Sequence, residues 1–98
     1  MSDWHVYMLD CDGKTLYTGV TTDIARRLEE HRGGGPRAAR YTRARTSVEL
    51  VYAVDVPDKS LAMRIEYRLK RLPALEKRAI AEQEATLDFL LERLGLEG

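Results

Sequence analysis

Apolar and aromatic residues gather in two short runs at the start of the chain, from Trp4 to Leu9 and from Thr15 to Val20. The second run is rich in β-branched and aromatic residues, which strands favour. Between the runs, the polar segment from Asp10 to Lys14 contains an Asp-Gly pair, which favours a tight turn between antiparallel strands. The pattern therefore predicts a β-hairpin.

After the hairpin, the apolar positions follow the helical interval. Residues 21–23 (Thr-Thr-Asp) are of the types that cap a helix start, and Ile24 and Leu28 repeat four residues apart. The three glycines and Pro36 that follow stop a helix firmly, which predicts a first helix from about residue 24 to the glycines. The arginine-rich stretch from Arg37 to Arg45 has no apolar period and is predicted to be a loop.

The second half of the chain predicts one more strand followed by helices. Residues 48–56 (VELVYAVDV) are mostly apolar, which predicts a strand that is buried on at least one side. From Ser60 onward, apolar residues recur at helical spacing as far as Leu69, which predicts a second helix. After Pro73, residues 74–94 predict one or two further amphipathic helices.

The predicted element order is β-β-α-β-α-α, which places the fold in the α+β class as a small three-stranded antiparallel sheet flanked by helices. With 98 residues, the chain has the length of one small domain. We therefore predict a single domain over residues 1–98, with its core over about residues 4–72 and C-terminal helices over residues 73–94.

Composition narrows the setting of this domain. The 44% of hydrophobic residues is ordinary for a globular protein, and the single cysteine, Cys11, excludes an intramolecular disulfide and a zinc site made of cysteines. The N-terminus, with Asp3, does not resemble a secretory signal, and no apolar run approaches membrane-spanning length. These features predict a cytoplasmic protein without a membrane partner.

Charge is unevenly distributed along the chain, although the formal net charge is zero. The stretch between residues 32 and 45 has no acid and carries five arginines: Arg32, Arg37, Arg40, Arg43 and Arg45. From Pro73 to Gly98, by contrast, acidic residues outnumber basic ones. A local basic patch is what phosphate binding requires, so the middle of the chain is a candidate contact for nucleic acid. A solvated basic loop explains the same residues equally well.

Two pairs of polar side chains have spacings that allow a shared site, although each pair also has an ordinary explanation. Tyr7 and Tyr17 lie on the two predicted hairpin strands, where their hydroxyls can share one face, yet strands favour tyrosine in any case. Arg27 and His31 stand four residues apart on the first helix, hence on one face. A solvated arginine and a histidine favoured by the helix dipole would be placed in the same way.

Glu66, on the second predicted helix, is the remaining candidate. It stands four residues before Lys70, a spacing typical of a surface ion pair. It also follows an apolar residue, so it can equally be a carboxylate at the edge of a buried face, available to a hard cation. Spacing alone does not choose between these two interpretations.

Taken together, the order and spacing of these residues resemble the GIY-YIG nuclease family. The two triplets that name the family correspond to residues 5–7 (His-Val-Tyr) and residues 17–19 (Tyr-Thr-Gly). An arginine follows eight residues after Gly19, a histidine four residues later, and a lone glutamate on the helix after the third strand. The similarity extends through about Leu72, and LYTGVTTDIARRLEEH and ARYTRARTSVELVY look especially like segments of the small single-domain bacterial members. Several motifs in the right order are far more specific than either triplet alone.

The resemblance implies cleavage of a phosphodiester with a divalent metal bound by Glu66 as its only protein ligand. Mg²⁺ (or Mn²⁺) suits this role, because Mg²⁺ keeps most of its waters and needs only one or two carboxylates. A single carboxylate also disfavours a two-metal arrangement. Tyr17 or Tyr7 would be the general base, provided that positive charge lowers the usual tyrosine pKa of about 10. Arg27 would stabilise the negative charge that develops on the phosphate.

The remaining family positions have supporting roles by the same resemblance. His31 would orient water or contact phosphate, and Gly19 would let the strand end turn into the helix beside the site. Tyr41 would stack on a base. The residues expected to contact nucleic acid are Arg37, Arg40, Tyr41, Arg43, Arg45 and Lys70.

The chain departs from the family pattern in two ways that keep a second function open. His5, Val6 and Thr18 replace the Gly and the two Ile that name the family, and the chain lacks the C-terminal Asn that many family nucleases carry. The function expected first is a metal-dependent endonuclease on DNA rather than RNA, selective for structure, with a role in DNA repair. The alternative is a catalytically weak or silent nucleic-acid-binding module with the same fold. Nothing in the sequence favours a third possibility, a protein-interaction domain.

Overall fold

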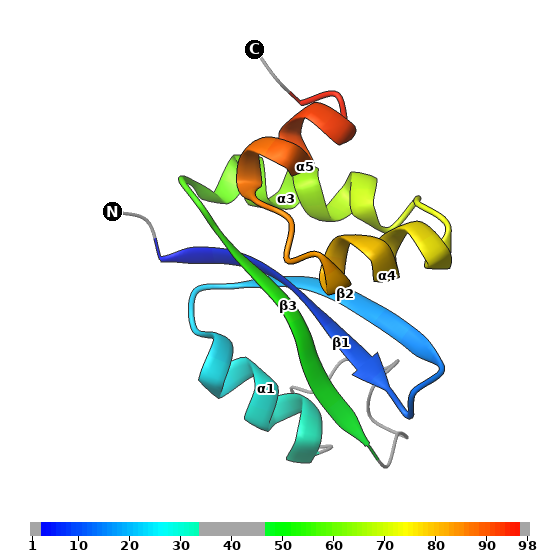
Figure 1. Cartoon of the computed structure of the whole chain (residues 1–98). Coiled ribbons are helices and arrows are strands. Elements are labelled where there is room, and N and C mark those ends of the chain that lie inside the picture. The colour runs from blue at the N-terminus through cyan, green and yellow to red at the C-terminus, as the bar shows by residue number, and fades with distance from the viewer. Residues whose placement is uncertain (1–2, 34–46, 97–98) are drawn as a thin grey trace.

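Three strands form one antiparallel sheet in the computed structural model, which describes residues 3–33 and 47–96 (Figure 1). The strands are β1 (Trp4–Cys11), β2 (Thr15–Thr21) and β3 (Val48–Val56), arranged in the order β2-β1-β3. Because β1 pairs with both of the others, β2 and β3 are the two edges of the sheet. The three-stranded antiparallel sheet predicted from the sequence is confirmed.

The hairpin turn is shorter than predicted, because β1 continues into the polar segment between the apolar runs. β1 extends to Cys11, which pairs with Thr15 at the start of β2. Asp12 and Gly13 adopt left-handed φ angles of 57° and 68°, a conformation that glycine reaches freely and aspartate tolerates. The amide of Asp12 also donates to the carbonyl of Ser47 at 2.8 Å, which ties the turn to the start of β3.

Four helices lie within the described residues: α1 (Ile24–Gly33), α3 (Lys59–Leu69), α4 (Ala74–Glu82) and α5 (Leu87–Arg93). Asp23, Asp58 and Thr86 precede three of them, and each side chain accepts a hydrogen bond from the backbone amide three residues later. These bonds satisfy amides that a helix start leaves unpaired. The C-terminal residues, predicted to form one or two helices, form two. No helix in the described part of the chain is long and apolar enough to cross a membrane.

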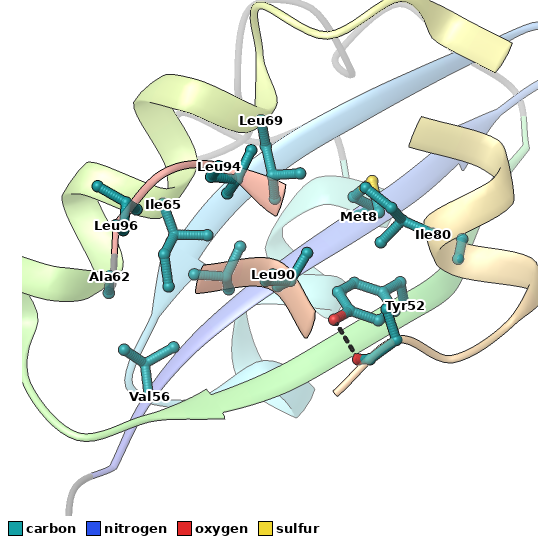
Figure 2. Packing of buried hydrophobic residues seen from close by; sticks show 13 residues of the cluster. Met8, Tyr52, Val56, Ala62, Ile65, Leu69, Ile80, Leu90, Leu94 and Leu96 are labelled. Atoms are coloured by element: carbon teal, nitrogen blue, oxygen red, sulfur yellow. Dashed lines mark hydrogen bonds between the residues drawn. The ribbon is translucent and has the colours of Figure 1, made fainter. Parts of the chain in front are cut away.

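The side chains of β1 alternate between two cores, one on each face of the sheet. Val6 and Met8 belong to the larger core, which α3, α4 and α5 cover, whereas Tyr7 and Leu9 belong to the smaller core beside α1. Figure 2 shows the larger core, where the hydroxyl of Tyr52 donates to a backbone carbonyl just before α5 at 2.6 Å. The sheet therefore lies between one helix and three.

Helices from both faces of the sheet contact its β2 edge. α3 and α4 both pack against β2. From the other face of the sheet, α1 brings His31 against Tyr17, with ring centroids 5.0 Å apart. Side chains from both layers can therefore meet beside β2.

Candidate active site

A hydrogen bond between β1 and α1 forms the buried base of the candidate site. The Tyr7 hydroxyl lies 3.0 Å from Nε2 of His31, and both side chains are almost completely buried. His31 lies in the last turn of α1, on the helix face turned toward the sheet. Only 1% of His31 and 2% of Tyr7 are exposed, so both side chains lie beneath the surface that a substrate would contact. Contact of His31 with water or phosphate stays a prediction.

A glycine is required at position 19 because a larger side chain would collide with Tyr7, and not because of its backbone conformation. Gly19 pairs with Tyr7 inside the sheet, and a Cβ atom there would lie 2.6 Å from the Tyr7 hydroxyl and 2.7 Å from its Cζ. The positive φ angles among the described glycines belong to Gly13 and Gly95. The prediction that Gly19 serves a turn into the helix is therefore wrong, because the residue lies within β2 and makes room for the phenol of Tyr7.

Replacing Gly19 by alanine is expected to displace Tyr7 and to lower any activity of the site about 10²-fold, the cost of a misplacement of about 1 Å. The free energy of unfolding should fall by about 1–3 kcal/mol, the usual cost of overpacking. Cleavage rates and chemical denaturation measure the two effects. Gly13→Ala is the control: it is strained at a φ of 68° but has nothing near its Cβ, so it should cost stability without lowering the rate. Equal rate losses in both variants would contradict this explanation of Gly19.

Tyr17 occupies the edge of the same group of rings. Its ring centroid lies 6.3 Å from that of Tyr7 and 5.0 Å from that of His31, with both pairs tilted. The ammonium of Lys70 lies 5.7 Å from the centre of the Tyr17 ring. Tyr17 is only partly buried, so of the two tyrosines it is the one more open to solvent.

Arg27 bridges the tyrosines and an acidic residue of its own helix. Its Nη1 donates to Oε1 of Glu30 at 3.1 Å, and the guanidinium also interacts with the Tyr7 hydroxyl, where it acts to lower the phenol pKa. Since arginine can only donate, Tyr7 accepts from Arg27, and the tautomer of the imidazole sets which partner donates in the bond between Tyr7 and His31.

The pKa values of the hydrogen-bonded pair move apart. Burial, with a contribution from Tyr17, raises the pKa of Tyr7 to about 12, and burial together with Arg27 lowers the pKa of His31 to about 4. This separation makes proton transfer from Tyr7 to His31 unfavourable. Tyr7 is therefore a neutral phenol and His31 a neutral imidazole over the whole physiological range.

The buried neutral histidine should make folding depend on pH. The pKa of His31 is 6.5 in the unfolded chain and about 4 in the folded one, so between these values the unfolded state binds more protons. The stability contribution of His31 is complete above pH 6.5 and is lost as the pH falls toward 4, by roughly 3 kcal/mol in all. Denaturant titrations across this range measure the loss.

Replacing the buried histidine separates this effect from other titrations. His31→Gln should flatten the fall in stability between pH 6.5 and 4, because the group that binds the extra proton in the unfolded chain is gone. A wild-type curve that superimposes on that of His31→Gln would show that the imidazole is not held neutral.

Glu66 brings a carboxylate from α3 to this group. Ile65 beside it is fully buried, while the Glu66 side chain keeps 18% of its surface exposed, with one carboxylate oxygen 3.6 Å from Nζ of Lys70. The Glu66 charge reaches Tyr7, where it acts to raise the phenol pKa against the lowering effect of Arg27. Both interpretations of Glu66 left open by the sequence therefore hold: it pairs with Lys70, and it lies at the edge of a buried face.

The donor set around Glu66 suits an ion that keeps most of its own waters. Within the described residues, no three His, Cys, Asp or Glu side chains cluster in a way that could hold a metal ion. A partly exposed single carboxylate is enough for Mg²⁺, which is commonly bound through one or two carboxylates and a substrate phosphate. Glu66 is thus the residue that would hold a divalent cation.

The structure brings together most of the predicted site. The residues that meet at the β2 edge are Tyr7, Tyr17, Gly19, Arg27, His31, Glu66 and Lys70. The predicted nucleic-acid contacts of the arginine-rich loop lie outside the described residues: Arg37, Arg40, Tyr41, Arg43 and Arg45. Sequence reasoning missed Glu30, although its position three residues after Arg27 is a known helical pairing interval that could have indicated it.

The fold and the site define a class of protein. It is a small α+β domain with paired tyrosines, an arginine and a glutamate at a sheet edge. The family model described as the GIY-YIG catalytic domain matches residues 3–79. The chain therefore belongs to the GIY-YIG family, which is a nuclease-type family, and the resemblance seen in the sequence is confirmed.

Its relatives are small proteins of similar length. The chain is 43% identical to the UPF0213 protein YhbQ of Salmonella arizonae over 94 residues, covering 96% of this chain and 92% of that protein. It is 47% identical to a UPF0213 protein of Halobacterium salinarum over 76 residues, covering 78% of this chain and 96% of that protein. The solution NMR structure of the UPF0213 protein BH0048 from Bacillus halodurans is 34% identical, with a TM-score of 0.53 and coverage of 96% and 98% of the two chains.

Proposed function

We propose that the protein is a metal-dependent endonuclease that hydrolyses phosphodiester bonds of nucleic acid. The observation that carries this proposal is the convergence of the Glu66 carboxylate, the Arg27 guanidinium and the two tyrosines on one partly open site. Hydrolysis of a phosphodiester needs a base for the attacking water and positive charge for the phosphate. The chain supplies a group of each kind.

Glu66 would hold the divalent cation, with Mg²⁺ or Mn²⁺ the ions that suit a single carboxylate. When bound, such an ion supplies Lewis-acid stabilisation of the charge on the phosphate oxygens. Lys70 pairs with the same carboxylate at 3.6 Å and so helps to orient Glu66 in the free protein.

Tyr17 is the general base in this proposal, and Tyr7 is a positioning residue. Tyr7 has a pKa of about 12, and its hydroxyl is hydrogen-bonded to Nε2 of the buried His31. Tyr17 is more open to solvent, and the Lys70 ammonium lies 5.7 Å from the centre of its ring. Tyr17 would take the proton of a water as the water oxygen bonds to phosphorus and the opposite P–O bond breaks.

Arg27 would bind the phosphate as the negative charge develops. Glu30 at 3.1 Å and the Tyr7 hydroxyl hold the guanidinium from two sides, which fixes its direction before substrate arrives. A donor that needs no reorganisation during the reaction is the most effective stabiliser of charge in a transition state.

DNA is the proposed substrate, with structure rather than base sequence as the feature selected, a cytoplasmic setting and a role in DNA repair. The arginines of residues 37–45 would grip the sugar-phosphate backbone, and Tyr41 would stack on a base. Contacts of these kinds carry little sequence information.

The test is a cleavage assay on branched, single-stranded and duplex DNA and on an RNA strand, with Mg²⁺, Mn²⁺ or EDTA. Scission of DNA that requires metal and stops in EDTA is the expected result. Binding without scission under every metal condition would favour the alternative function, a silent binding module, which the missing asparagine supports. Absence of both binding and scission would overturn both functions.

A further inference from the structure

A cavity of about 410 Å³ opens beside Tyr17, between β2 and the helices α3 and α4. Its lining residues are Leu16, Tyr17, Thr18, Lys70 and Lys77. A volume above about 300 Å³ is in the range of small-ligand pockets and exceeds what a single phosphate group needs. The cavity therefore has room for a phosphate together with the sugar that carries it.

Among the residues that the structure describes, two polar groups that line this cavity lack the partners that such groups usually have in a folded protein. Lys77 of α4 is half-buried and, within residues 3–33 and 47–96, its side chain makes no ion pair. Thr18 is 2% exposed, and its hydroxyl finds no hydrogen-bond partner in the described part of the chain. An unpaired buried hydroxyl and an unpaired half-buried ammonium both cost free energy, which an anionic ligand with acceptor oxygens would offset.

The position of the cavity decides which anion it fits. Tyr17 belongs both to the cavity wall and to the candidate active site, and Lys70 reaches from the wall to Glu66 at 3.6 Å. A strand whose phosphodiester lies at Tyr17 and Glu66 therefore has its next nucleotide within reach of Lys77. No acidic residue among those described lines the cavity, so its charge is positive and complements phosphate.

We propose that this cavity is a subsite for the backbone phosphate adjacent to the cleaved phosphodiester, with Lys77 and the Thr18 hydroxyl as its donors. The proposal rests on the proposed function and adds a specific nucleotide position to it. Lys77 is the diagnostic residue, because Lys70 is shared with Glu66 whereas Lys77 has no other charged partner in the described structure.

The first experiment measures binding of a short single-stranded oligonucleotide in EDTA, where no cleavage can occur, over a range of salt concentrations. Lys77→Gln is expected to raise Kd about fivefold and to reduce the slope of log K against log salt by about 0.7, the contribution of one single-strand phosphate. Lys77→Arg should restore both values. Lys59→Gln is the matched control, because Lys59 is an exposed lysine that lies over Trp4, roughly 16 Å along α3 from the cavity residue Lys70.

The second experiment locates the phosphate. A series of the same oligonucleotide carries one neutral methylphosphonate at each successive position, and each is bound by wild type and by Lys77→Gln. At one position next to the cleaved bond, neutralisation should weaken binding to wild type about fivefold and have no effect on the variant. At the other positions the two proteins should lose affinity equally.

The outcomes separate this subsite from the proposed function. If wild type binds and cleaves DNA but Lys77→Gln matches Lys59→Gln in affinity and salt slope, the subsite is overturned and the nuclease stands. The subsite is also overturned if the losses of affinity caused by Lys77→Gln and by the methylphosphonate are additive at every position of the oligonucleotide. If wild type neither binds nor cleaves, the proposed function fails and the subsite fails with it.

Discussion

Glu66→Gln is expected to lower the rate of metal-dependent cleavage about 10³-fold, because the loss of a bound cation removes several kcal/mol of transition-state stabilisation. Glutamine keeps the size of the side chain and removes the charge that holds the ion. Affinity for Mn²⁺, followed by isothermal titration, should fall in parallel with the rate. The free energy of unfolding should change by less than about 0.5 kcal/mol, since the pair lost with Lys70 is a surface helical pair.

Glu29→Gln is the matched control for this change. Glu29 lies on α1 and is exposed, so its replacement alters the net charge equally without touching the site. Its rate and its Mn²⁺ affinity should equal those of wild type. A Glu66→Gln protein that cleaves at the wild-type rate, or an equal loss in both variants, would remove Glu66 from the proposed metal site.

The fold could be predicted from the sequence because its local signals agree with its tertiary structure. Residues 48–56 are mostly apolar and form β3 with those bounds. Asp12 and Gly13 adopt the positive φ angles that an Asp-Gly turn demands. The strand ends were less predictable, since Asp10 and Cys11 lie beyond the apolar run and continue β1 by pairing with β2 on one side and β3 on the other.

The sequence allowed the residues of the candidate site to be predicted as a set, but not the burial, ionisation or packing of each one. Burial sets the ionisation of His31, and no local pattern in α1 reports how deeply its last turn is enclosed. Gly19 needs its small size because of a ring twelve residues earlier in the chain, which only the strand register brings over it. Lys77 faces Thr18 through the packing of α4 against β2, a contact across most of the chain.

Tyr17→Phe is expected to lower kcat about 10³-fold, within the range for loss of a general base, and to leave the free energy of unfolding nearly unchanged. The hydroxyl that it removes lies on a partly exposed ring, whereas the apolar contacts of that ring with Tyr7 and His31 remain. The rise of the rate with pH that a tyrosine base produces should also disappear. Single-turnover cleavage across a pH series, together with denaturant unfolding, measures all three quantities.

Tyr7→Phe supplies the contrast, because the two hydroxyls are held in different ways. Removing the Tyr7 hydroxyl leaves Nε2 of buried His31 without its partner, which should cost about 1–3 kcal/mol of stability. The rate should fall by about tenfold as Arg27 loses one of the two groups that orient it, while the rise of the rate with pH persists. The reverse result, a flat pH profile in Tyr7→Phe and a retained one in Tyr17→Phe, would make Tyr7 the base despite its burial. In that case the phenol of Tyr7, with its pKa of about 12, would lose its proton only in the substrate complex. A cation on Glu66 and the phosphate on Arg27 would first have to rearrange the site around it.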